Sequence, residues 1–105
     1  MKYNVIRTET ADEQIRKIIL YVAEKFGNEV ALEKLSQLEK SIDNLRDNPR
    51  MGMDPYYRLL RRQGFKVLIV EKNLIFYKIN DERKEIIIYA VVDQRQDYIN
   101  IIRGL

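Results

Sequence analysis

The second half of the chain collects basic side chains that could bind or cleave a polyanion. Residues 50–105 contain 11 of the 19 Lys and Arg residues but 7 of the 16 Asp and Glu residues. The candidates for this chemistry are Arg58, Arg61, Arg62, Lys66, Arg95 and Tyr98. The charge distribution favours a polyanionic partner such as RNA. An acidic protein partner, or a basic surface that only keeps the protein soluble, would also explain it.

Cleavage of RNA without a metal would give these side chains three tasks. One group must take the proton of the 2′-hydroxyl, another must stabilise the charge at phosphorus, and a third must protonate the 5′-oxygen. A lysine, an arginine and a tyrosine could perform these tasks in that order. The chain has no His, the usual general base near neutral pH, and no Cys. Since transition metals normally bind these two residue types, we expect no metal and no cofactor.

Length and composition limit where such a site can lie. The 105 residues are enough for a single domain, residues 1–105. No disulfide is possible, which suits a reducing compartment. The sequence has no apolar run of about eighteen residues, and its start, MKYNVIRTET, does not resemble a signal peptide. We therefore expect a cytoplasmic protein that does not contact a membrane.

Two amphipathic helices are predicted in the first half. Thr10 would begin the first helix, with Glu13 in capping-box spacing, and Gly27 would end it. Asn28 would cap the second helix, which would end at Asn48-Pro49. The apolar stripes are Ile15, Ile18, Ile19, Val22, Ala23 and Phe26 in the first helix, and Leu32, Leu35, Leu38, Ile42 and Leu45 in the second. So short a link predicts an antiparallel helical hairpin.

The remaining segments have the composition of strands. The predicted strands are Lys2–Arg7, Tyr56–Arg62, Phe65–Val70, Leu74–Ile79 and Glu85–Val92. Short turns separate the last four, so these should be antiparallel neighbours. The predicted order is β-α-α-β-β-β-β: an α+β fold in which an N-terminal helical hairpin packs on a mostly antiparallel, twisted sheet.

The last strand is apolar on both faces. By simple alternation, one face would hold Ile86, Ile88, Ala90 and Val92, and the other Ile87, Tyr89 and Val91. A helical hairpin can cover only one of these faces. The other face needs a cover of its own: a C-terminal helical turn at Tyr98–Ile102, a second copy of the chain, or another protein.

Three features in this order resemble the RelE/ParE superfamily of toxins. The first is the helical phrase YVAEKFGNEVALEKLSQLEKSIDNLRDNP after a first strand. The second is the strand pair FKVLIVEKNLIFYKI, and the third is AVVDQRQDY, a last strand followed by the pattern x-x-R-x-D-Y. The resemblance covers nearly the whole chain. It implies the toxin of a type II toxin–antitoxin system with a RelE/ParE-like fold.

The resemblance also implies partners. Members of the superfamily are neutralised by a cognate antitoxin, and the complex contacts operator DNA mainly through the antitoxin. RelE-like members cut mRNA on the ribosome, ParE-like members inhibit DNA gyrase without cleaving RNA, and others have no assigned target. An acidic, amphipathic antitoxin segment would suit a basic sheet with surplus apolar area, although a homodimer could use the same face.

The resemblance assigns roles to three of the candidates. Lys66 takes the place of a basic residue of RelE-like toxins, Arg95 that of the arginine after the last strand, and Tyr98 that of the tyrosine in the R-x-D-Y ending. Two departures weaken RNA cleavage: Asp93 replaces the histidine of many relatives, and Leu74 replaces an arginine of RelE-like nucleases. We predict mRNA cleavage first, gyrase inhibition as the alternative, and a degenerate toxin that only binds its antitoxin as the third reading.

Each candidate residue could also have a purely structural role. The arginines Arg58, Arg61 and Arg62 could form a solvated strand edge that prevents aggregation, and they are otherwise the phosphate-binding candidates. Lys66 could extend from an apolar face to water. Arg95 could pair with an aspartate at position 93 or 97, and Tyr98 could be a core aromatic.

Overall fold

The computed structural model of the protein describes residues 2–105. A short strand comes first, followed by two long helices, a short helix, three strands and a last short helix. The elements are β1 (Asn4–Arg7), α1 (Glu9–Phe26), α2 (Asn28–Asp43), a 3-10 turn (Asn44–Arg46), α3 (Arg58–Arg62), β2 (Lys66–Val70), β3 (Asn73–Asn80), β4 (Glu85–Asp93) and α4 (Tyr98–Ile102). No helix in this range is both long and apolar enough to cross a lipid bilayer.

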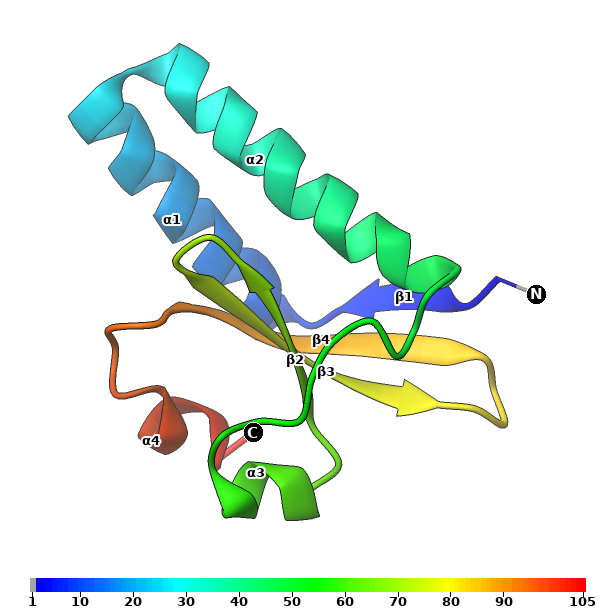
Figure 1. The fold of residues 1–105 in the computed structure, drawn as a ribbon. Coiled ribbons are helices and arrows are strands. Elements are labelled where there is room, and N and C mark those ends of the chain that lie inside the picture. Colours follow the sequence, from blue (N-terminus) through cyan, green and yellow to red (C-terminus); the bar gives the residue numbers. More distant parts are fainter. Residues whose placement is uncertain (1) are drawn as a thin grey trace.

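The four strands of the described residues form one sheet in the order β1-β4-β3-β2. β1 runs parallel to β4, whereas β2, β3 and β4 are antiparallel neighbours. The α1–α2 hairpin lies across one face, and α3 and α4 lie at the other (Figure 1). This arrangement confirms the predicted α+β class, with an N-terminal helical hairpin on a mostly antiparallel sheet.

The ends of the two long helices differ in detail from the predicted ends. Thr8, and not Thr10, caps α1: its backbone is extended, and its hydroxyl accepts a hydrogen bond from the amide of Ala11 at 3.1 Å. Gly27 ends α1 with a φ of 93°, which glycine adopts without strain. Gly27 also precedes α2 directly, so the prediction that the Asn28 side chain caps this helix is wrong.

The predicted strand at Tyr56–Arg62 is wrong, because residues Arg58–Arg62 form α3. Leucine and arginine are good helix formers, and Tyr57 enters the turn in an extended conformation. The helical turn buries Leu60 completely while its charged neighbours stay in water. The sheet therefore has four strands within the described range, and three of the basic candidates lie on a short helix.

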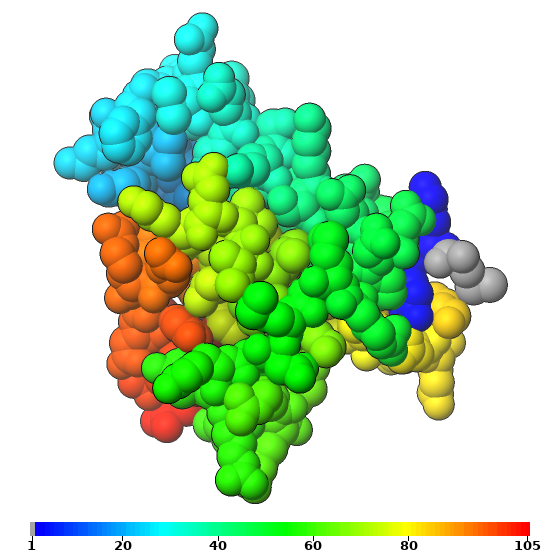
Figure 2. All heavy atoms as spheres, viewed as in Figure 1, coloured from blue at the N-terminus to red at the C-terminus, as the bar shows by residue number. Residues whose placement is uncertain are grey.

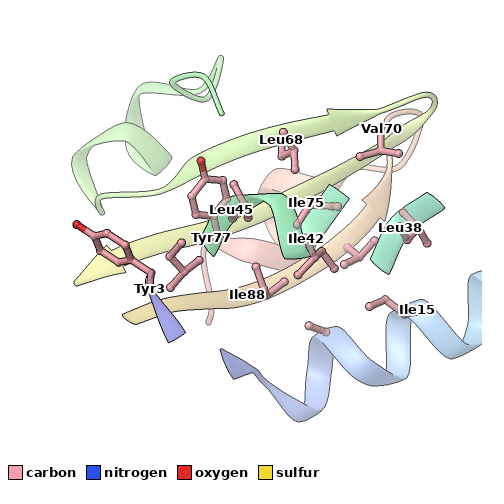
Figure 3. Close-up of a cluster of buried hydrophobic side chains, with 13 residues drawn as sticks. Tyr3, Ile15, Leu38, Ile42, Leu45, Leu68, Val70, Ile75, Tyr77 and Ile88 are labelled. Atoms are coloured by element: carbon pink, nitrogen blue, oxygen red, sulfur yellow. The ribbon is translucent and has the colours of Figure 1, made fainter. Parts of the chain in front are cut away.

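The larger hydrophobic core lies between the helical hairpin and the sheet (Figure 3). Its buried members are Tyr3, Ala11, Ile15, Leu38, Ile42, Leu45, Leu68, Val70, Ile75, Tyr77, Ile86, Ile88 and Val91. They come from the residue before β1, from α1 and α2, from the 3-10 turn and from the three antiparallel strands. Removal of this apolar surface from water is the main force that holds the hairpin on the sheet.

A second core lies on the opposite face of the sheet. Its buried members are Leu60, Phe65, Val67, Leu74, Phe76, Ala90, Val92 and Ile102. Ile102 of α4 is fully buried, and Tyr98 and Ile99 pack beside it. The C-terminal helical turn thus covers part of the second apolar face, as the sequence predicts, and α3 covers another part.

A β-bulge at Tyr89 breaks the alternation along β4. The pairing of β4 with β3 shifts by one residue at this point. The residues facing the helical hairpin are Ile86, Ile88 and Val91, and those facing the second core are Tyr89, Ala90 and Val92. The predicted pattern, which kept Ala90 and Val92 with Ile88, is therefore wrong beyond the bulge.

Gln14 of α1 supports the bulged strand from outside the sheet. Its side-chain oxygen accepts a hydrogen bond from the Val91 amide at 2.7 Å. Gln14→Leu should leave this amide without its acceptor and lower the free energy of unfolding by about 1–3 kcal/mol in urea denaturation. The control Gln37→Leu removes an exposed hydrogen bond to Glu71 and should cost less than about 0.5 kcal/mol. Equal losses in the two variants would contradict a role for Gln14 in the bulge.

The helical hairpin is longer than the sheet that it covers. Its tip projects past the strands (Figure 1). Phe26, the last residue of α1, is consequently 66% exposed, although the apolar stripe predicted it as core. Leu32 is 64% exposed for another reason: its neighbour Ala31 is buried, so Leu32 lies off the buried side of α2. The helical periodicity identifies the buried side of α1 and, apart from Leu32, that of α2, but it does not show where the sheet ends.

Candidate functional site

Arg95 lies just beyond the end of β4 and is held by a neighbouring carboxylate. Its Nε and Nη2 donate to the two carboxylate oxygens of Asp93 at 3.0 Å each, and its backbone amide donates to Asp93 Oδ1 at 2.8 Å. Hydrogen bonds from this guanidinium, and from the same residue's amide, hold the pKa of Asp93 below its ordinary value. Asp93 thus occupies the two-pronged donor face with which Arg95 would bind a phosphate.

Lys66 lies at the start of β2 and also has a carboxylate partner. Its Nζ donates to Asp54 Oδ1 at 3.0 Å. Asp54 is brought there by the preceding loop, because Met53 forms a bridge to Val67 at the outer edge of the sheet. This contact occupies the Nζ that would have to approach a 2′-hydroxyl if Lys66 acted as the base.

Tyr98 belongs to a cluster of aromatic rings between α3 and α4. Its ring centroid lies 5.5 Å from that of Tyr57 and 5.4 Å from that of Phe76. Figure 2 shows the segment that contains α3, in green, against α4, in red. Burial raises the pKa of Tyr98, and the nearby hydroxyls of Tyr57 and Tyr56 raise it further. Tyr98 therefore remains protonated at neutral pH and contributes packing to the second core.

The three arginines of α3 are all exposed. Arg61 Nη1 donates to the carbonyl oxygens of Pro55 and Tyr56, at 2.9 and 2.8 Å, and so ties α3 to the loop before it. Arg58 and Arg62 form no ion pair with any residue in the described range. These two exposed cations are therefore available to a partner.

The structure does not bring the three predicted catalytic residues together. Lys66 pairs with Tyr77 in the sheet, whereas Arg95 lies just beyond the residue that pairs with Asn73. Tyr77 and Asn73 are separated by about 13 Å along the strand. Lys66 lies two residues before Leu68 and so on the same face of β2 as the larger core, whereas Tyr98 packs in the second core on the opposite face of the sheet.

Sequence reasoning missed an aromatic frame around Lys78 on the second face. The Lys78 Nζ lies 4.6 Å from the ring centroid of Phe65 and 5.1 Å from that of Tyr89. Phe65 and Tyr89 themselves meet edge to face, with centroids 5.5 Å apart. Alternation does place Tyr89 on the same face as Ile87, but it does not show that Phe65 and Lys78 meet it there. The only signal in the sequence is a lysine inside an otherwise apolar strand.

The family comparison identifies the class of protein that combines this fold with this basic surface. Residues 5–98 match the family described as the ParE toxin of the type II toxin–antitoxin system parDE. This chain belongs to that family, and it is a type II toxin of the RelE/ParE superfamily. The sequence matches no protein of curated function.

Solved structures show the same fold. A chain of the chromosomal ParDE toxin–antitoxin system from P. aeruginosa is 18% identical, with a TM-score of 0.72 over 88% of this chain and 96% of that one. E. coli RelE, solved as a mutant in the free state, is 16% identical, with a TM-score of 0.64 over 99% and 96%. The RelBE2 complex from Mycobacterium tuberculosis gives 20% identity and a TM-score of 0.59 over 91% and 95%.

Proposed function

We propose that this protein is a toxin that acts in the cytoplasm by binding a protein target, in the manner of the ParE-like inhibitors of DNA gyrase. We further propose that a cognate antitoxin with an acidic, amphipathic segment neutralises it, and that the antitoxin makes the contacts to operator DNA. The solved relatives from P. aeruginosa and M. tuberculosis, which are described as toxin–antitoxin systems or complexes, support the antitoxin. The net charge of +3 favours an acidic partner.

We favour a protein target over RNA cleavage because the three catalytic candidates, Lys66, Arg95 and Tyr98, lie apart in the structure. A metal-free RNA cleavage needs its base, its acid and its phosphate-binding group around one phosphate. Here Lys66 and Arg95 each have a carboxylate partner, and Tyr98 lies on the opposite face from Lys66. The leucine at position 74 supplies no charge. Binding a protein does not require these side chains to converge.

Ribosome-dependent cleavage of mRNA is the second candidate function, and one observation favours it. Arg58 and Arg62 form no ion pair within the described range, and the rings of Tyr56 and Tyr57, which directly precede α3, are exposed. Cations next to aromatic faces can bind the phosphates and stack the bases of a single strand. On this reading, both ion pairs described above would have to open when RNA binds.

Induced expression separates the two functions. For a gyrase inhibitor we expect growth arrest with intact messages, a rise in the response to DNA damage, and loss of supercoiling by purified gyrase with excess toxin. The Arg95→Ala variant provides the comparison for nuclease activity, because cleavage through Arg95 would stop in it. Cuts at codon boundaries in the wild type that disappear in Arg95→Ala would reject the protein-target proposal.

Two further outcomes of the expression experiment would also decide between the candidate functions. Harmless overexpression of the folded protein would indicate a degenerate toxin and would also reject the proposal. Normal supercoiling, combined with intact messages and arrested growth, would reject gyrase as the target while leaving a protein target in place. Copurification with the product of the neighbouring reading frame tests the antitoxin independently.

A further inference from the structure

A row of side chains crosses the second face of the sheet from one edge to the other. Ile6 of β1 pairs with Ile87 of β4, and Ile87 pairs with Lys78 of β3. The ring of Phe65, the residue directly before β2, completes the row beside Lys78. Tyr89 packs against both of these residues from the bulge. We call these five residues the transverse stripe.

The helices of this protein leave the transverse stripe partly open. α3 and α4 pack over the other end of the second face, around Phe76 and Val92. The helical hairpin lies on the opposite face, and the ends of β3 and β4 that carry the stripe reach beyond α3 and α4 (Figure 1). Ile6 is 38% exposed, and Ile87 and Tyr89 are half-buried. Apolar side chains here remain in contact with water.

Lys78 is the charged centre of the transverse stripe and has no carboxylate partner within residues 2–105. The side chain is half-buried between two rings, so its ammonium group has lost part of its hydration. A cation in this setting gains more from an anion than a fully hydrated surface lysine does. The aromatic frame also fixes where the anion must lie.

We propose that the transverse stripe is a contact site for the acidic, amphipathic segment of the antitoxin. Apolar side chains of that segment would pack on Ile6, Ile87 and Tyr89, and a carboxylate would bind the Nζ of Lys78. Aromatic residues around a partly desolvated charge are typical of the side chains that dominate binding at protein interfaces. This inference rests on the proposed antitoxin and states where on the toxin its segment would bind.

The composition of the stripe favours this occupant over the alternatives. A nucleic acid would require several cations along the path of its phosphates, and the stripe contains one lysine among apolar side chains. A second copy of the chain carries the same positive net charge, and two stripes facing each other would bring Lys78 against its own counterpart. An acidic protein segment satisfies both the charge and the apolar surface.

Charge reversal at Lys78 tests the contact. The probe is the protein encoded by the reading frame next to this one, purified and titrated into the toxin by calorimetry. Lys78→Glu should weaken binding about tenfold or more, whereas Lys17→Glu, on the exposed surface of α1, should change it less than about twofold. Lys78→Met, which keeps the apolar stem, should show an intermediate loss and an unchanged melting curve. Wild-type affinity in Lys78→Glu would overturn the proposal.

Chemical modification provides a second measurement that needs no variant. Acetylation of lysines in the free toxin should label both Lys78 and Lys17, and the complex should protect Lys78 alone of these two. Equal labelling of Lys78 in the free and bound forms would overturn the inference. If the probe does not bind wild-type toxin, the antitoxin proposal itself fails. Loss of RNA binding, or of self-association, in place of probe binding would assign the stripe to another partner.

Discussion

Ile88→Asp is expected to leave the protein largely unfolded. Ile88 is fully buried in the core between the helical hairpin and the sheet. An aspartate there would be an unpaired charge, or a protonated acid, in an apolar environment, and it would also lose the packing of the isoleucine. We expect a cost above about 4 kcal/mol, a large part of the 5–15 kcal/mol that usually stabilises a domain. Circular dichroism during thermal and urea denaturation would measure the loss.

The matched control is Ile69→Asp on the edge strand β2. The substitution is chemically identical, but Ile69 is 49% exposed, so its carboxylate would remain hydrated. We expect a change of about 1 kcal/mol or less. A normal melting curve for Ile88→Asp, or equal losses for the two variants, would show that the assignment of β4 and of its buried face is wrong.

Gly52→Ala is expected to destabilise the loop that covers the outer edge of β2. A Cβ at this position would lie 2.6 Å from the Tyr77 hydroxyl oxygen and 2.8 Å from the carbonyl oxygen of Val67. The hydroxyl cannot move freely, because it donates to the Pro49 carbonyl at 2.8 Å and accepts from the Gly52 amide at 3.0 Å. We expect a loss of about 2–4 kcal/mol from the displaced backbone and broken hydrogen bonds.

Two further variants test whether the Tyr77 hydroxyl causes this effect. Gly104→Ala is the control, since a Cβ there would have no neighbour within 4 Å, and it should leave the free energy of unfolding unchanged within about 0.5 kcal/mol. Tyr77→Phe alone should cost about 1–3 kcal/mol, because the Gly52 amide loses its acceptor and the Pro49 carbonyl loses its donor. The double variant Gly52→Ala/Tyr77→Phe should cost less than the sum of the two single changes. Strict additivity would contradict the proposed clash.

Much of the fold follows from local patterns in the sequence. The apolar stripes of α1 and α2, and the glycine between them, predict the helical hairpin, because helical periodicity is a property of neighbouring residues. The β-branched and aromatic runs predict β2, β3 and β4 for the same reason. The segment Tyr56–Arg62 is ambiguous in the sequence, because two leucines among arginines and tyrosines fit a strand or a helical turn. Burial of Leu60 in the second core decided between them.

The candidate site depended more on contacts between distant residues. The types and the approximate place of Lys66, Arg95 and Tyr98 could be found from the sequence, but their partners and faces could not. Asp54 reaches Lys66 only because its loop follows the sheet edge. Arg95 could pair with Asp93 or with Asp97, each two residues away, and in the structure it pairs with Asp93.

The sequence by itself determined the class of fold, the helical hairpin, the three antiparallel strands and the basic character of the second half. The tertiary structure decided which side chains share a face. The bulge at Tyr89 reverses the faces on which the later residues of β4 lie. The Val91 amide beside it donates a hydrogen bond to Gln14, which is 77 positions away in the chain. Periodicity records only the relation of a residue to its neighbours. The frame around Lys78 arises where three strands meet, and no local pattern contains that information.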